Sequence, residues 1–128
     1  MKVVAAIIRS AEGNVLITQR GKGMSFEGKW EFPGGKVEEG ETPSEALKRE
    51  IQEELCLEIH IDQQELEWTH EYSFGKVDFI AYNSRVVAGV LQLVEHMGYR
   101  WEKIDNLNTY DWTPADVKLV NKLCGGNL

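Results

Sequence analysis

Apolar runs separated by short polar turns predict a chain of strands interrupted by two helices. Residues 3–8 form an apolar run rich in β-branched residues, as in a buried strand, and residues 15–18 resume the run after a turn. These two segments predict a hairpin that opens a sheet. Further strands are expected at 57–61, 66–73, 77–88 and 99–104, with 66–73 and 77–88 forming a second hairpin. Residues 90–94 fit either a short strand or the edge of a loop.

The two helices are marked by their N-terminal signals. Thr42-Pro43-Ser44-Glu45 has the pattern of a capping box with proline at the first helical position, so a helix begins at about Pro43. Its apolar stripe consists of Ala46, Leu47, Ile51 and Leu55. Thr113 and Pro114 begin a second helix that runs to about Cys124, and Gly125-Gly126 ends it. This order predicts one α/β domain over residues 1–128, with a mixed β-sheet sandwiched between helices.

Three carboxylates lie on one face of the first predicted helix. Glu50, Glu53 and Glu54 have i, i+3 and i+4 spacing, near the helix end where the macrodipole disfavours anions. Residues 38–54 hold seven acids and two bases, which is −5 of the chain's net charge of −7. An acidic run is often only a solvated helix face. The poor interleaving of charge here favours a hard divalent cation bound by these oxygens.

Composition excludes several classes of function. The acidic balance argues against a partner that is a nucleic acid polymer, although a bound cation would still permit a phosphate substrate. Two cysteines give no disulfide framework, and the early apolar run is too short for a signal peptide or membrane span. We therefore expect a cytoplasmic protein without a membrane partner. A near P-loop at residues 23–29 is rejected, because Trp30 replaces the required Ser or Thr and Pro33 prevents the helix.

The acidic stretch resembles the Nudix box, the sequence signature of the Nudix hydrolase family. Eight of nine fixed positions agree at the required spacing: Gly35, Glu41, Arg49-Glu50-Ile51, Glu53-Glu54 and Leu57. Cys56 stands where the family has glycine, so we expect a strained turn at a cost of about 1 kcal/mol. Residues 17–20, 30–38, 95–101 and 113–116 are similar to the MutT-type nucleoside triphosphate pyrophosphohydrolases, a resemblance that covers most of the chain.

This resemblance implies the Nudix fold and hydrolysis of nucleoside triphosphates to a monophosphate and pyrophosphate with Mg²⁺ or Mn²⁺. Glu53 and Glu54 would be metal ligands, Glu50 a ligand or base, and the Gly34 carbonyl a further contact. Glu95 matches a downstream glutamate that binds metal or activates water; alternatively it is an exposed loop acid. Arg49 and Glu41 would orient the carboxylates.

Recognition of the substrate is expected from residues outside the box. Arg20 and Lys36 would contact phosphates, or are plain surface cations. Asp116 accepts hydrogen bonds, and so fits the exocyclic amine of cytosine in (d)CTP or a modified nucleotide, with 8-oxo-dGTP as the alternative. It could instead cap the second helix. Phe32 and Tyr72 would flank the base or belong to the core.

Three further alternatives stay open. An ADP-ribose or dinucleoside-polyphosphate hydrolase is the runner-up among enzymes, and a non-catalytic nucleotide-binding module would normally have lost box carboxylates. The protein could be a monomer or a homodimer. His60, His70 and His96 show no ligand spacing and receive no role.

Overall fold

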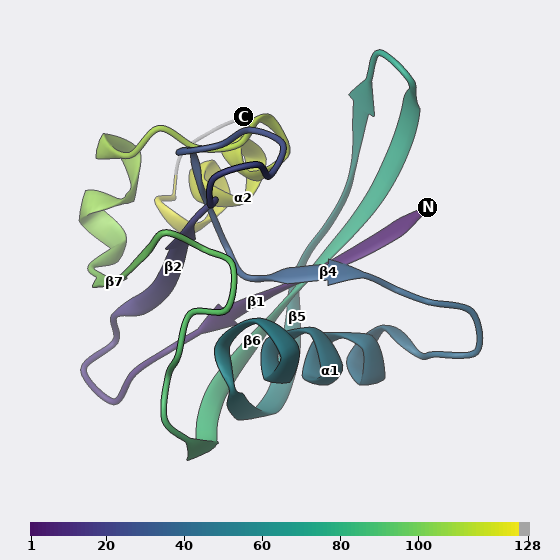
Figure 1. The fold of residues 1–128 in the computed structure, drawn as a ribbon. Helices are drawn as coiled ribbons and strands as arrows, with labels where there is room; N and C mark the ends of the chain where they lie inside the picture. The colour runs from purple at the N-terminus through teal and green to yellow at the C-terminus, as the bar shows by residue number, and fades with distance from the viewer. Residues whose placement is uncertain (126–128) are drawn as a thin grey trace.

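The computed structural model describes residues 1–125 and arranges them as strands and helices around two sheets (Figure 1). The elements are β1 (Lys2–Ile8), β2 (Val15–Gln19), β3 (Trp30–Glu31), β4 (Gly34–Lys36), α1 (Pro43–Leu55), β5 (Leu57–Tyr72), β6 (Gly75–Gly89), β7 (Gly98–Glu102), η1 (Ile104–Thr109), η2 (Pro114–Asp116) and α2 (Val117–Leu123).

The larger sheet has the strand order β4-β1-β6-β5 and is mixed, because β1 runs parallel to β6 while the other pairs are antiparallel. The smaller sheet, β3-β2-β7, is antiparallel. The predicted hairpin of residues 3–8 and 15–18 is therefore wrong beyond a single antiparallel bridge between Arg9 and Val15, since β1 and β2 belong to different sheets. Val15 to Thr18 are all buried, and a run that is apolar on both faces does not specify which neighbour it pairs with.

Alternate residues of β1 face two hydrophobic layers. Val4, Ala6 and Ile8 pack with the apolar stripe of α1. Ala5 and Ile7 face the other way, into a layer that includes Leu119 of α2. Figure 1 shows α1 and α2 on opposite sides of the larger sheet. The expected α/β class, with a mixed sheet between helices, is confirmed.

The first helix begins and ends as the sequence predicts. The Thr42 hydroxyl accepts from the Glu45 backbone N–H at 3.2 Å, and the Glu45 carboxylate accepts from the Thr42 N–H at 2.8 Å. At the other end Cys56 caps the helix in the left-handed region, with φ 59°. The predicted strain at this position is therefore present, because a Cβ at positive φ crowds the backbone.

The middle of the chain is more continuous than predicted. Residues 57–61 and 66–73 form one strand, β5, whose register with β6 shifts between Ile61 and Leu66. The hairpin of β5 and β6 is confirmed. Residues 90–94 form a loop, which settles the alternative left open, and β7 ends at Glu102 because Ile104 already begins the 3₁₀ helix η1.

The second helix differs from the prediction at its start. Residues 114–116 form a 3₁₀ turn and the α-helix begins at Val117. Neither Thr113 nor Asp116 makes a side-chain capping hydrogen bond, because the Asp116 carboxylate turns away to the Phe32 N–H. Gly125 has φ 73°, as expected for a residue that ends a helix, and Gly126 lies outside the described residues. Within residues 1–125, every helix is too short or too polar to cross a membrane.

Candidate active site

Glutamates from α1 and from the loop after β6 line one acidic cavity of about 300 Å³. Glu50, Glu53 and Glu54 come from the helix, and Glu95 comes from the loop beside Val94. Two backbone hydrogen bonds attach this loop to α1: Val94 N–H donates to the Glu54 carbonyl at 3.2 Å, and Gln92 N–H donates to the Leu55 carbonyl at 3.0 Å. The free carbonyls of the helix end thus hold Glu95 next to the other carboxylates.

Arg49 binds three of the surrounding carboxylates at once. Its guanidinium makes a bidentate pair with Glu41, at 2.7 and 3.0 Å. One nitrogen, Nη1, also donates to Glu50 Oε1 at 2.9 Å and to Glu53 Oε1 at 3.0 Å. The bond from Arg49 lowers the pKa of Glu41, so that residue remains an anion that anchors the arginine. These bonds place Arg49 and Glu41 where they could orient the other carboxylates, and that role stays a prediction.

The acidic cavity favours a cation electrostatically. Burial, together with the negative charges of Glu31 and Glu50, raises the pKa of Glu54 to about 8. Burial is also the main cause that raises the pKa of Glu50. Both carboxylates would ionise more readily beside a divalent cation, and their oxygens are the ligands that Mg²⁺ and Mn²⁺ prefer. Among residues 1–125 no three acidic, histidine or cysteine side chains already converge at coordination spacing, so the carboxylates line the cavity without forming a closed shell.

The glycines of β4 let backbone and carboxylates approach closely. A Cβ on Gly35 would lie 2.2 Å from Glu50 Oε2, so a side chain at this position would displace that carboxylate. A Cβ on Gly34 would lie 2.0 Å from the Val4 carbonyl, and the Gly34 N–H donates to Glu54 Oε1 at 3.3 Å. The Gly34 backbone thus lies beside a predicted metal ligand, and both glycines also line a second cavity.

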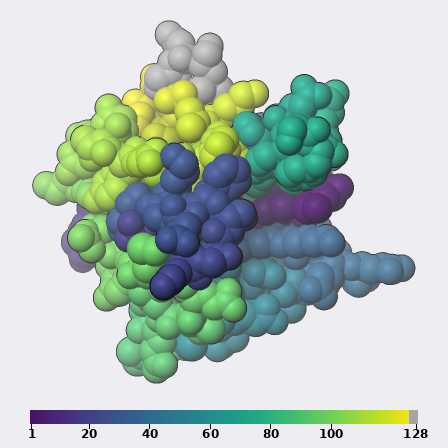
Figure 2. Space-filling view, turned by 45° about the horizontal axis from the view of Figure 1, so that its top comes forward, coloured from purple at the N-terminus to yellow at the C-terminus, as the bar shows by residue number. Residues whose placement is uncertain are grey.

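This second cavity, of about 190 Å³, collects four of the five predicted substrate residues. They are Arg20, Phe32, Tyr72 and Asp116. Arg20 directly follows β2, Phe32 directly follows β3, Tyr72 ends β5 and Asp116 ends η2. Figure 2 shows the loop of residues 21–29, in dark blue, beside a recess in which the purple N-terminal strand is visible, with the teal β5–β6 hairpin above it. Gly34 and Gly35 form the wall of this cavity that leads to Glu50 and Glu54.

Asp116 is buried in the wall of the second cavity. One carboxylate oxygen accepts the Phe32 N–H at 2.8 Å, which leaves its other oxygen without a protein partner among the described hydrogen bonds. Burial, with a smaller contribution from Glu31, raises its pKa from 3.8 to about 7. The alternative that Asp116 is only a helix cap is wrong, because its side chain bonds to the Phe32 N–H, between β3 and β4, and not to its own helix.

The two predicted aromatic residues differ in their surroundings. Phe32 is 3% exposed and stacks on Trp112 at 5.3 Å between ring centroids, so it is a core residue that also forms part of the cavity wall. Tyr72 is half-buried near the tip of the β5–β6 hairpin, where it stacks on Phe74 at 4.9 Å and meets His70 edge-on. Tyr72 therefore offers more open ring surface to a ligand.

The two predicted phosphate-binding cations lie apart. Arg20 lines the second cavity, but its Nη1 already donates to both oxygens of Glu31, at 2.9 and 3.0 Å, and its other nitrogens bond to Ser25. Lys36 is exposed on β4 and lines neither cavity, and its backbone carbonyl accepts from Arg49 at 3.1 Å. Its role at a phosphate stays a prediction.

Sequence reasoning missed Glu31 and His96. The Glu31 carboxylate bonds to Arg20 and lies 2.8 Å from Nε2 of His96, whose side chain is almost fully buried. Glu31 is also the charge that contributes to the raised pKa of both Glu54 and Asp116. Its negative charge therefore acts on one carboxylate of each cavity, Glu54 in the first and Asp116 in the second. A single glutamate in a short strand and an isolated histidine carry no spacing signal, so the pattern of the chain could not identify them.

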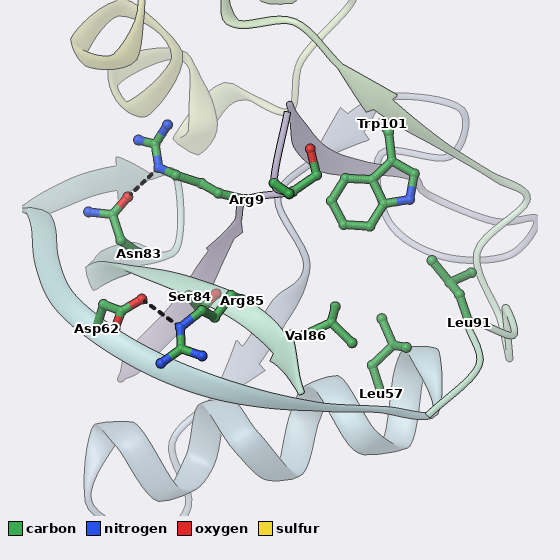
Figure 3. A pocket seen from close by; sticks show the side chains of 11 residues that line it. Arg9, Leu57, Asp62, Asn83, Ser84, Arg85, Val86, Leu91 and Trp101 are labelled. Atoms are coloured by element: carbon green, nitrogen blue, oxygen red, sulfur yellow. Dashed lines mark hydrogen bonds and ion pairs between the residues drawn. The ribbon is translucent and has the colours of Figure 1, made fainter. Parts of the chain in front are cut away.

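A larger cavity of about 670 Å³ lies away from these carboxylates (Figure 3). Trp101, Val86, Leu57 and Leu91 line one part of it, and the ion pair of Arg85 with Asp62, at 3.9 Å, lines another. Its single acidic residue, Asp62, is thus paired with an arginine. By volume alone this cavity would be the candidate active site. A metal-dependent reaction, however, needs carboxylates such as those of the acidic cavity.

The sequence model of the NUDIX domain matches residues 1–123. The chain is 34% identical over 123 residues to an 8-oxo-dGTP diphosphatase of Haemophilus influenzae, covering 96% of this chain and 90% of that protein. It is 35% identical over 120 residues to a CTP pyrophosphohydrolase of Escherichia coli, covering 94% and 88%.

Solved structures agree with the sequence comparisons. A MutT protein from Methanosarcina mazei Go1 has a TM-score of 0.83 with 28% identity, covering 96% of this chain and 89% of that one. The DNA mismatch repair protein MutT of methicillin-resistant Staphylococcus aureus 252, of the family Nudix hydrolase, has a TM-score of 0.76 with 39% identity, covering 98% and 95%.

Proposed function

Because the chain belongs to the Nudix hydrolases and is a MutT-type nucleotide pyrophosphohydrolase, we propose that it converts (deoxy)cytidine triphosphates, or modified forms of them, to the monophosphate and pyrophosphate. The observation that carries this proposal is the pair of adjoining cavities. The base cavity is lined by Tyr72 and Asp116, and the acidic cavity by Glu53 and Glu54. Gly34 and Gly35, in the wall of the base cavity, lie against Glu54 and Glu50 of the acidic cavity. A nucleotide whose base occupies the first cavity would extend its phosphates toward the second.

The acidic cavity would hold Mg²⁺ or Mn²⁺. Glu53 and Glu54 are proposed as ligands, Glu50 as a ligand or base, and the Gly34 carbonyl and Glu95 as further contacts. A bound cation would neutralise phosphate oxygens and polarise the attacking water. Arg49, through its bonds to Glu41, Glu50 and Glu53, would keep the carboxylates in place while the charge on the phosphates changes.

Asp116 supports the choice of cytosine. Its oxygen that is not bonded to Phe32 can accept the exocyclic amine of cytosine, the pairing that Asp and Glu make with this base elsewhere. With a pKa of about 7, the group is also protonated in part of the population at neutral pH, and a protonated oxygen can donate to the ring nitrogen beside the amine. Cytosine carries the amine, which donates, and the ring nitrogen, which accepts, at neighbouring positions.

The second candidate is 8-oxo-dGTP, and the same residue supports it. An ionised Asp116 can accept from two neighbouring N–H groups, which guanine bases offer at the ring nitrogen and the amine. One relative with similar coverage is an 8-oxo-dGTP diphosphatase. The choice between the two bases therefore depends on which protonation state of Asp116 is present when the substrate binds.

A panel of nucleotides tests the proposal. Purified protein with Mg²⁺ is incubated with canonical triphosphates, 5-modified dCTP and 8-oxo-dGTP, and pyrophosphate and orthophosphate are measured separately. We expect pyrophosphate as the product, with the highest kcat/KM for a cytosine nucleotide. Greatest efficiency on 8-oxo-dGTP would overturn the cytosine assignment, and failure to release pyrophosphate from any triphosphate would overturn the reaction itself.

A further inference from the structure

Phe26 combines a strained backbone conformation with an exposed aromatic side chain. Together with Cys56 it is one of two non-glycine residues within 1–125 that have a positive φ, in its case 55°. For a bulky aromatic residue this conformation costs free energy, and Phe26 also leaves 41% of its surface exposed. Cys56 is explained by the end of α1. Phe26 lies instead in a turn of the loop between β2 and β3, away from the ends of both α-helices.

The loop of residues 21–29 holds Phe26 over the base cavity. The Phe26 carbonyl accepts the Lys29 N–H at 3.0 Å, and the neighbouring Ser25 is bound by the Arg20 guanidinium through both its carbonyl and its hydroxyl. Gly28 N–H donates to the Arg20 carbonyl at 2.9 Å. The backbone on both sides of Phe26 is thus fixed, and its ring lines the same cavity as Tyr72 and Asp116.

The two aromatic rings of this cavity are packed against each other as a tilted pair. The centroids of Phe26 and Tyr72 lie 6.5 Å apart and their planes are inclined by 32°. A flat ring between two others needs about 7 Å, because each carbon-to-carbon contact is about 3.5 Å. A separation of roughly half an ångström, together with rotation of the two rings towards parallel, would therefore admit a base. Tyr72 is supported against such a shift by stacking on Phe74, with planes within 9° of parallel.

We propose that Phe26 and Tyr72 form an aromatic clamp, in which the nucleotide base is held between the two rings. This proposal rests on the proposed function. It adds to the base site a residue, Phe26, that the Nudix-box pattern does not contain. Every base has two aromatic faces, so stacking supplies affinity that is similar for all bases, whereas Asp116 at the edge of the base supplies the preference.

Calorimetric binding of CMP, 8-oxo-dGMP and inorganic pyrophosphate tests the clamp without relying on catalysis. The Phe26→Leu variant keeps a β-carbon at positive φ but lacks the ring. We expect its dissociation constants for both monophosphates to rise on the order of tenfold, while that for pyrophosphate, which has no base, is unchanged. The Phe26→Tyr variant restores the ring and should bind both monophosphates like the wild type.

Tyr99→Leu is the matched control, because Tyr99 is also 41% exposed but lines neither the base cavity nor the acidic cavity. It should bind all three ligands normally. The clamp is overturned if Phe26→Leu binds CMP as tightly as the wild type, or if the wild type binds no monophosphate. A different outcome separates the two proposals. If Phe26→Leu weakens the binding of CMP but the wild type releases no pyrophosphate from any triphosphate, the proposed function is overturned and the clamp stands.

Discussion

The acidic cavity and the base cavity are neighbours, but they are assembled differently. Three of the four glutamates of the acidic cavity come from one helix, and Arg49 of the same helix holds two of them. The base cavity takes its walls from β1, β3, β4, β5, β6 and η2, and from the segment of residues 20–29 between β2 and β3. A change in the acidic cavity should therefore affect the reaction on every nucleotide, whereas a change in the base cavity should affect which nucleotide is chosen.

Glu31 links the two cavities electrostatically. It contributes to the raised pKa of Glu54 on one side and of Asp116 on the other, and its own charge is balanced by Arg20. The two cavities thus share one anionic neighbour.

Removing one charge from the acidic cavity should have the largest effect. In Glu54→Gln the side chain keeps its size but is a poorer metal ligand, so we expect kcat to fall on the order of 10²–10³-fold for every triphosphate. Pyrophosphate release at saturating Mg²⁺ measures this loss. Glu58→Gln, an exposed glutamate on β5, is the control and should retain full activity. A loss confined to one nucleotide would contradict the division between the cavities.

Replacing the arginine that organises the carboxylates should cost less. Lysine cannot reproduce the bidentate pair with Glu41 while also reaching Glu50 and Glu53, so Arg49→Lys should lower kcat by about 10–100-fold with little change in KM. The apparent Mg²⁺ requirement should rise as well. Lys48→Arg, on an exposed neighbouring position, should change neither quantity. An unchanged Mg²⁺ requirement in Arg49→Lys would show that the arginine does not orient the ligands.

In the base cavity, Asp116→Asn should alter preference and not the reaction. Asparagine always donates as well as accepts, so the ratio of kcat/KM for dCTP over 8-oxo-dGTP should change on the order of tenfold. Steady-state kinetics on the two substrates give this ratio. The exposed Asp105→Asn variant should leave it unaltered. If both substrates lose efficiency by the same factor, Asp116 supports the cavity but does not read the base.

The same variant predicts a change in the pH dependence of stability. In the folded protein Asp116 has a pKa of about 7, above its ordinary value of 3.8, so its contribution to stability is complete below about pH 4 and is lost as the pH rises to about 7. Asp116→Asn removes this loss. Relative to the wild type, the free energy of unfolding of the variant should rise by up to about 1.4 kcal/mol for each pH unit between about pH 4 and about pH 7. Urea unfolding of both proteins between pH 5 and pH 8 measures the difference, and a constant difference would refute the raised pKa.

The smallest effect is expected at the end of α1. Cys56 adopts φ 59°, so Cys56→Gly should raise the free energy of unfolding by about 1 kcal/mol while kcat stays constant. Cys56→Ala keeps the β-carbon and should give no such gain. Chemical denaturation of the three proteins compares them. A gain with alanine as large as that with glycine would show that the thiol, and not the backbone conformation, is unfavourable.

Predictions from the sequence succeeded where neighbouring residues decide the structure. The capping box at Thr42 and Glu45, the apolar stripe of α1 and the positive φ of Cys56 depend on residues within a few positions of one another. They failed where distant residues decide it. The pairing of β1 with β6, the separation of β2 into another sheet and the start of the second helix each depend on a partner far along the chain.

The acidic face follows from local sequence alone, because the period of a helix places Glu50, Glu53 and Glu54 together wherever the helix lies. The surroundings of that face depend on contacts between distant parts of the chain. The fold placed Glu31 and His96 in contact across 65 positions, turned Asp116 from its own helix to the Phe32 N–H, and set Phe26 opposite Tyr72. These contacts join side chains that share no periodic spacing, so burial and strand pairing had to bring them together.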